Sequence, residues 1–233
     1  MKELESACSK LKTGKACGFD EICNEMIISL VNTHPKILLK LFDEILQSGD
    51  ITPEWLTGMI VPIYKSGPKL DTSNYRGITL ISCLGKLFLS ILNTRLHIFA
   101  KTQNILSESQ LGFVPGNRTS DAHIIIHNLV RKVCHKNNGK IFSCFVDFQK
   151  AFDSIPRDVL LKKLNNYGIT GKFFNVLRII YTSDKACIKL NNSRSAFFDL
   201  NLGVRQGCIL SPLLFNIFLS DLTKKFEGME GKL

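Results

Sequence analysis

The sequence predicts an α+β fold in which helices mix irregularly with short strands. Of the 233 residues, 45% are apolar and 16 are Phe, a composition typical of a chain that folds around a core. Some segments repeat apolar residues at helical spacing, and others are short and rich in β-branched and aromatic residues. Because helices and strands do not alternate regularly, the order favours a small antiparallel sheet over a parallel βαβ arrangement.

The helices are predicted from apolar periodicity and from signals at their ends. Residues 35–47 place their apolar side chains on one face, and Gly49 follows shortly afterwards. Ser120 is a plausible cap for a helix beginning at residue 121, and Ser211 with Pro212 gives the cap and first turn of the last helix. In chain order, helices are predicted at residues 35–47, 84–100, 121–136, 157–167, 172–181 and 211–226.

The strands are predicted from short apolar runs bounded by turn residues. They are expected at residues 59–64, 141–146, 185–190 and 196–200, with the last two forming a hairpin across NNSRS. The run at 141–146, IFSCFV, reads as a buried strand that ends directly at Asp147.

Asp147 is the first candidate for chemistry. An ionised carboxylate against an apolar strand is costly unless it is paired, hydrogen-bonded or bound to a cation. Mg²⁺ takes oxygen ligands and favours sites shared between carboxylates and substrate phosphates, so the position suggests metal-bound phosphoryl transfer. Taken alone, an exposed turn explains Asp147 equally well, because Asp is common in turns.

Charge is spread unevenly along the chain. Residues 1–60 hold 6 Lys and Arg against 9 Asp and Glu, whereas residues 61–140 hold 11 against 3 and residues 141–233 hold 13 against 8. The whole chain carries a net charge of +10. An excess of basic residues in the middle of the chain suits a surface that follows a phosphate backbone, although many basic proteins bind no nucleic acid.

Five blocks of sequence carry a family resemblance. The blocks are VDFQKAFDSI (146–155), GVRQGCILSPLLFN (203–216), IVPIYKSG (60–67), NYRGITL (74–80) and KTGKACGFDEICNEMI (12–27). In that order they resemble motif A, motif B, two fingers motifs and the N-terminal extension motif of the reverse transcriptases of non-LTR (LINE-type) retrotransposons. The blocks occur in the family's order and span nearly the whole chain.

The resemblance implies a fold, partners and a cofactor. It implies a right-hand polymerase, with a fingers-like region and N-terminal extension in residues 1–135 and a partial palm in residues 136–233. The implied partners are an RNA template, a DNA primer and deoxynucleotide triphosphates, and the implied cofactor is Mg²⁺. The implied reaction is RNA-directed DNA synthesis.

The resemblance also assigns roles to single residues. Asp147 and the backbone carbonyl of Phe148 match the family's metal ligands, with Asp147 as the catalytic carboxylate. Lys65 and Arg76 match basic residues that grip the triphosphate, and a guanidinium fork suits phosphate oxygens. The family usually has Pro where this chain has Gly77, which loosens the turn but removes no chemical group.

Three more residues match the nucleotide site of the family. Phe152 matches a bulky aromatic beneath the incoming sugar, where a large ring clashes with a ribose 2′-hydroxyl; without the motif, a core Phe is the simpler reading. Gln206 and Gly207 match a turn beneath the base pair, where Gly allows close backbone approach and Gln offers an amide donor.

The family's motif C, which supplies two more carboxylates, has no counterpart here. The chain contains no Asp-Asp pair, and one carboxylate with one carbonyl is a poor cage for two Mg²⁺ ions. The resemblance therefore implies a reverse transcriptase domain truncated before motif C, with little or no polymerase activity alone and apolar surface left uncovered.

Two other functions stay open. The chain could be a non-catalytic module that binds RNA or DNA through its basic region, or an RNA-templated RNA polymerase or intron maturase, against which Phe152 and the KAFD string argue. The eight Cys show no zinc spacing and fit reduced thiols. With no signal peptide and no membrane-length apolar run, the sequence predicts an intracellular protein, in nucleus or cytoplasm, without a membrane partner.

Overall fold

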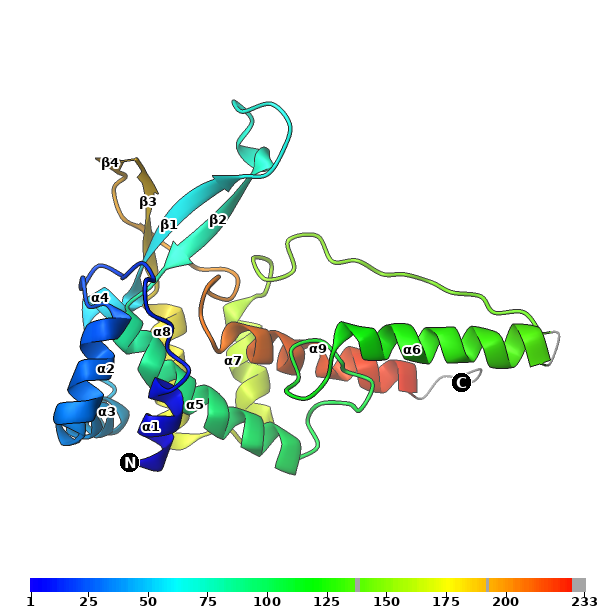
Figure 1. Cartoon of the computed structure of the whole chain (residues 1–233), viewed down its shortest axis with the longest axis horizontal. Helices are drawn as coiled ribbons and strands as arrows, with labels where there is room; N and C mark the ends of the chain where they lie inside the picture. The colour runs from blue at the N-terminus through cyan, green and yellow to red at the C-terminus, as the bar shows by residue number, and fades with distance from the viewer. Residues whose placement is uncertain (137–138, 192, 228–233) are drawn as a thin grey trace.

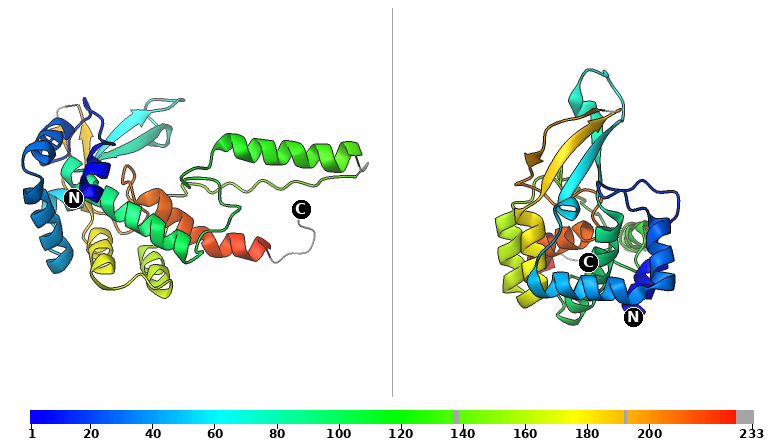
Figure 2. Two further views of the ribbon diagram at one scale, coloured as in Figure 1. Left: turned by 60° about the horizontal axis from the view of Figure 1, so that its bottom comes forward. Right: turned by 90° about the vertical axis from the view of Figure 1, so that its left-hand side faces the viewer.

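The computed structural model describes residues 1–136, 139–191 and 193–227. A small sheet stands above a body of packed helices, and one helix with the chain that follows it projects sideways from this body (Figures 1 and 2). The helical elements are α1 (Lys2–Cys8), α2 (Asn24–Thr33), α3 (Pro35–Ser48), α4 (Pro53–Leu56), η1 (Thr72–Asn74), α5 (Cys83–Thr102), α6 (Thr119–Val130), η2 (Arg131–Lys136), α7 (Arg157–Asn166), α8 (Gly171–Thr182) and α9 (Ser211–Glu227). The strands are β1 (Thr57–Tyr64), β2 (Tyr75–Leu80), β3 (Lys185–Leu190), β4 (Ser193–Arg194) and β5 (Phe198–Asp199).

The sheet combines antiparallel and parallel pairs. β1 and β2 form an antiparallel hairpin in which Met59 faces Leu80 and Tyr64 faces Tyr75. β3 runs parallel to β1, and both β4 and β5 pair antiparallel with β3. The mixture of helices with a small sheet agrees with the prediction, but the purely antiparallel sheet was wrong. Parallel pairing needs a long connection between the strands, whereas a hairpin gives an antiparallel pair. Helices α5 to α8 lie between β2 and β3 in the chain, so β3 can pair with β1 in the parallel direction.

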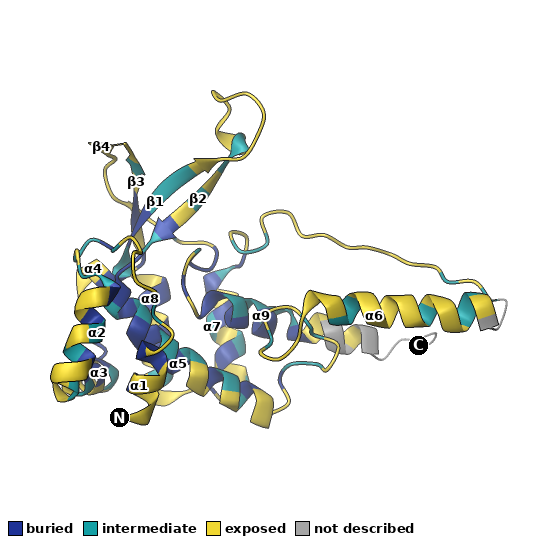
Figure 3. Ribbon diagram, viewed as in Figure 1, coloured by how far each residue is buried: buried dark blue, intermediate teal, exposed yellow. Residues whose placement is uncertain are grey.

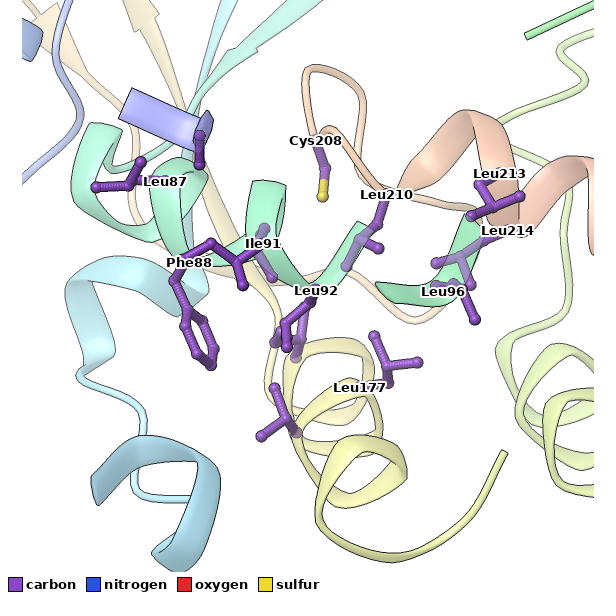
Figure 4. Packing of buried hydrophobic residues seen from close by; sticks show 14 of the residues in the cluster. Leu87, Phe88, Ile91, Leu92, Leu96, Leu177, Cys208, Leu210, Leu213 and Leu214 are labelled. Atoms are coloured by element: carbon purple, nitrogen blue, oxygen red, sulfur yellow. The ribbon is translucent and has the colours of Figure 1, made fainter. Parts of the chain in front are cut away.

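Helix α5 forms the centre of the core. Its apolar residues face α8 on one side and the start of α9 on another, with Leu214 of α9 beside Leu96 of α5 (Figure 4). The same cluster includes residues of α1, α2, α3 and α7. Figure 3 shows these buried residues in dark blue, running through the helical body below the sheet. The core therefore fixes α9, and the loop before it, against the base of the β1–β2 hairpin.

The start of α5 is anchored by the N-terminal loop. Ser82 caps the helix by accepting a hydrogen bond from the Gly85 N–H at 2.9 Å, and its hydroxyl donates to Asp20 at 2.5 Å. Gly18 packs so closely that a Cβ there would lie 2.5 Å from the Ser82 nitrogen. The KACGFD string thus has a structural role, because it joins the N-terminal loop to the central helix.

Helix ends agree with the predictions in most places. α3 begins at Pro35 and ends at Ser48, followed by the cap residue Gly49 with a φ of 80°, and α9 begins at Ser211. The predicted cap at Ser120 was wrong, because α6 begins at Thr119 and its Arg118 N–H donates to the Asp121 carboxylate at 2.7 Å. The predicted helix at 121–136 continues as the π-helical turn η2 after Val130. Helices α1, α2 and α4 and strand β2 were not predicted from the sequence.

The largest difference lies in residues 141–146. The predicted buried strand is extended chain that forms no ladder with any described segment, and Phe142 and Phe145 are 93% and 88% exposed. This segment runs alongside the projecting helix α6, and most of the surface of α6 is also exposed (Figures 1 and 3). A strand needs a second segment to accept its N–H and C=O groups, and its apolar pattern cannot supply one.

Candidate functional site

A cavity of about 610 Å³ lies where the hairpin, the loop before α9 and the segment before α7 meet. Its wall consists of residues 76–78 of β2, residues 205–209 and 211–212, and two aromatic side chains, Phe113 and Phe152. It therefore collects residues from three of the sequence blocks described above.

Backbone hydrogen bonds hold two of these blocks side by side. The N–H of Val204 donates to the carbonyl of Phe152, and the N–H of Gly203 donates to the carbonyl of Ile155, both at 2.8 Å. Gly203 has a φ of 79°, and a Cβ there would lie 2.7 Å from the Asp153 Cα. Only Gly fits this crossing, so the chain brings the Phe152 segment and the Gln206 loop together through their backbones.

Gln206 is fixed by a side-chain contact. Its Nε2 donates to the Oδ1 of Asp153 at 2.5 Å. The amide donor that the sequence analysis expected to face a ligand is therefore used within the protein. Through this hydrogen bond, Asp153 connects the two walls of the cavity.

Gly207 lies against β2. It has a φ of 89°, and a Cβ there would lie 2.6 Å from the carbonyl oxygen of Thr79. The close backbone approach expected at Gly207 is thus an approach to the protein's own strand. It closes one side of the cavity by placing the loop directly against the hairpin.

Phe152 belongs to a group of three rings. It stacks on Phe215 of α9, with ring centroids 5.0 Å apart and an interplanar angle of 17°. Phe113 meets it edge-on, with centroids 6.0 Å apart and an angle of 88°. Both arrangements are favourable for aromatic pairs. Phe152 therefore lines the cavity with its ring held from two directions.

The cavity floor rests on a buried cluster of charges. The carboxylate of Asp184 contacts Arg157 at 2.7 Å and Arg205 at 2.9 Å. Arg157 also donates to the Gly203 carbonyl at 2.8 Å, and Arg205 donates to the Trp55 carbonyl at 3.0 Å. Burial raises the pKa of Asp184, and the Arg205 and Arg157 guanidinium groups oppose that rise. With two cations and one anion, the cluster leaves positive charge beneath the cavity.

Cys208 also lines the cavity, but its thiol is buried. Burial raises the pKa of the Cys208 thiol, so the sulfur stays protonated and is a poor nucleophile or metal ligand.

The structure brings together four of the predicted site residues and leaves three apart. Arg76, Phe152, Gln206 and Gly207 line the cavity. Lys65 does not line it, because it follows the last paired residue of β1 and its side chain is exposed. Asp147 and Phe148 do not line it either, since both belong to the exposed segment before Phe152.

The described residues do not fit a magnesium pair. Within the described ranges, no three His, Cys, Asp or Glu side chains lie close enough to hold a metal ion. Asp147 is exposed and offers one carboxylate, whereas Mg²⁺ needs near-octahedral oxygen coordination. This donor set supports no catalytic step through a metal.

Phe113 and Arg205 are among the lining residues that were not predicted as site residues. Phe113 lies in the turn-rich string GFVPGN, which reads as a loop, and nothing local says that its ring reaches Phe152. Arg205 was part of the recognised string, yet a buried charge could be inferred only from its distant partner Asp184.

In the part of the chain that the structure describes, no helix has both the length and the apolar character that crossing a membrane requires.

Comparison with known proteins agrees with the motifs. The family model for "Reverse transcriptase (RNA-dependent DNA polymerase)" matches residues 63–230. The chain is 28% identical over 225 residues to the "Probable RNA-directed DNA polymerase from transposon BS" of Drosophila melanogaster, covering 95% of this chain and 24% of that protein. It is also 28% identical over 225 residues to the "RNA-directed DNA polymerase from mobile element jockey" of Drosophila funebris, with coverage of 95% and 24%.

A vertebrate relative matches at similar extent. The "Transposon TX1 uncharacterized 149 kDa protein" of Xenopus laevis is 24% identical over 233 residues, covering 98% of this chain and 18% of that protein. The chain thus spans about a quarter or less of the length of these relatives. The resemblance to the reverse transcriptases of non-LTR retrotransposons is confirmed by these relatives together with the family model, which covers well over half of the sequence. The chain belongs to the reverse transcriptase (RNA-dependent DNA polymerase) family.

Proposed function

We propose that this chain is the fingers and partial palm of an RNA-directed DNA polymerase, and that its cavity takes the incoming deoxynucleotide triphosphate. Residues 1–135 are the fingers-like region with the N-terminal extension, and residues 136–233 are the partial palm. One observation carries the proposal. Arg76, Phe152, Gln206 and Gly207, which come from three separate sequence blocks, line a single cavity.

The chemistry of the wall suits a nucleotide. Arg76 is exposed on β2 and can grip phosphate oxygens through its planar fork, and the buried Arg157–Asp184–Arg205 cluster adds positive charge below. Phe152 lines the cavity, and its ring would lie beneath the sugar, where a 2′-hydroxyl would meet it. The Gln206–Gly207 turn, fixed by Asp153 and β2, forms a rigid platform for the base.

Nucleotide binding by the isolated chain tests this assignment. We expect dATP to bind in equilibrium dialysis and Arg76→Ala to weaken binding about tenfold or more, as expected when a charge-assisted hydrogen bond is lost. Arg178→Ala is the matched control, because Arg178 is exposed on α8 and lies outside the cavity. Equal loss in both variants, or no dATP binding by the native chain, would contradict the proposal.

Catalysis is a separate matter from binding. Asp147 and the Phe148 carbonyl are the proposed metal ligands, but they need further carboxylates to hold the Mg²⁺ ions that phosphoryl transfer requires. We therefore expect no primer extension by this chain alone with Mg²⁺ or Mn²⁺. Robust extension on an RNA template that is lost in Asp147→Ala would overturn this expectation.

A non-catalytic nucleic-acid-binding module is the second candidate. It is favoured by the net charge of residues 61–140, which hold 11 Lys and Arg against 3 Asp and Glu, and by the exposure of the hairpin residues Lys65, Lys69 and Arg76. RNA affinity that falls steeply with salt and is unchanged in Asp147→Asn, together with absent dATP binding, would favour this module over the polymerase assignment.

A further inference from the structure

The loop that carries Phe113 is fastened to α9 by two side-chain amides. The Nδ2 of Asn216 donates to the Gly112 carbonyl at 2.8 Å, and the Nε2 of Gln110 donates to the Oδ1 of Asn216 at 3.2 Å. Gln110 also donates to the Gly112 carbonyl at 3.1 Å. Asn216 is 3% exposed, so the two hydrogen bonds that its amide makes are partly shielded from water.

The fastening sets the conformation of the next residue. Phe113 has a φ of 59°, in the left-handed region that a side chain with a Cβ rarely adopts. Its ring is 59% exposed, so burial in the core does not explain its place. A bulky residue held in this conformation with its ring in solvent points to a local constraint that serves another contact.

That other contact is Phe152. The Phe113 ring meets Phe152 edge-on at 6.0 Å, while Phe215 stacks on Phe152 at 5.0 Å. Phe215 and Asn216 are neighbours on α9, so one turn of this helix holds the Phe152 ring directly and the Phe113 loop through the amides. The Phe152 ring therefore contacts two other rings, and α9 holds both of them.

We propose that Phe113 is a positioning residue that acts through Phe152, and that it sets how strongly the cavity prefers deoxyribonucleotides to ribonucleotides. This inference rests on the proposed function. A ring excludes a 2′-hydroxyl only while it stays in the path of that group. Loss of one lateral contact would let the ring tilt out of that path. Phe113 supplies the lateral contact, and Gln110 and Asn216 hold Phe113 in place.

The test compares dATP with ATP, which differ only in the 2′-hydroxyl. The ratio of their dissociation constants is measured by equilibrium dialysis for the native chain, Phe113→Leu and Phe113→Tyr. We expect Phe113→Leu to lower the discrimination against ATP about two- to tenfold, the range spanned by aromatic pairs, with dATP affinity nearly unchanged. Phe113→Tyr keeps the ring edge and is expected to restore the native ratio.

Two further variants keep the result interpretable. Gln110→Ala removes the amide contacts from a partly exposed position and is expected to lower the ratio in the same direction. Phe197→Leu is the control, because Phe197 is also 59% exposed but lies outside the cavity, and it should leave the ratio unchanged.

The outcomes separate the two proposals. If dATP binds and Arg76→Ala weakens it, but Phe113→Leu and Gln110→Ala leave the ratio as in the native chain, the role of Phe113 is refuted and the proposed function stands. If the native chain binds neither nucleotide, the proposed function fails and this inference fails with it.

Discussion

The side-chain amide of Gln206 donates a hydrogen bond to the carboxylate of Asp153 at 2.5 Å, and so joins the loop before α9 to the segment that carries Phe152. The two residues lie 53 positions apart in the sequence. Backbone hydrogen bonds also run from Val204 to Phe152 and from Gly203 to Ile155. Together with the Gln206–Asp153 contact, they form one corner of the cavity.

Breaking this contact should loosen the corner. Asp153→Ala removes the charged acceptor, and we expect a loss of about 1 kcal/mol in the free energy of unfolding, since the pair is exposed to water. Affinity for dATP should fall severalfold because the platform under the base becomes mobile. Urea unfolding and equilibrium dialysis measure the two effects, with Asp158→Ala as a control at an exposed position on α7. Native dATP affinity in Asp153→Ala would show that the contact does not shape the cavity.

Replacing Gly207 tests the close approach to β2. Gly207→Ala faces two penalties, because φ is 89° and the new Cβ would lie 2.6 Å from the Thr79 carbonyl. Gly116→Ala is a matched control, since Gly116 has a φ of 94° with nothing within 4 Å of a Cβ. We expect Gly116→Ala to cost about 1–2 kcal/mol, and Gly207→Ala to cost about 1–3 kcal/mol more. Equal losses in chemical denaturation would mean that the loop moves freely away from the strand.

The buried charges beneath the cavity should matter for stability. Asp184→Asn leaves Arg157 and Arg205 without their shared anion, which is expected to lower the free energy of unfolding by about 3–5 kcal/mol. The control is Asp199→Asn, because Asp199 is 69% exposed and its partner Lys185 lies 3.9 Å away. A surface pair of that kind contributes at most about 1 kcal/mol. Similar stability of the two variants would contradict the importance of the buried cluster.

The docking of α1 on α5 should weaken in acid. Arg95 donates to both oxygens of Glu3, at 2.8 and 2.6 Å, and the hydrogen bond to Arg95 lowers the pKa of Glu3. A carboxylate whose pKa is lower in the folded state stabilises the fold above its unfolded pKa, about 4.3, and this contribution is lost as pH falls through the folded value. About half of each side chain is exposed, so the effect should stay below about 1 kcal/mol.

The measurement is a comparison of unfolding free energies at neutral and acidic pH. Glu3→Gln should be less stable than the native chain at pH 7 and equally stable near pH 2. Arg95→Gln should show the same pattern, and the double variant should add little to either single loss. A gap between native and Glu3→Gln that persists at pH 2 would assign the contribution to packing instead of charge.

The sequence by itself determined the longer periodic helices and several members of the site. The strongly periodic segments became α3 and α5, and Ser211-Pro212 marked the start of α9, because a helix satisfies its backbone groups within its own residues. Motif recognition picked out Arg76, Phe152, Gln206 and Gly207, which share one cavity.

Tertiary structure alone decided what depends on distant partners. The apolar run at 141–146 lies extended without a strand partner, β3 joins β1 in parallel, Gly207 meets Thr79, and Phe113 reaches Phe152. Strand pairing, ring contacts and buried ion pairs form between segments that are far apart in the chain, so no local pattern specifies them.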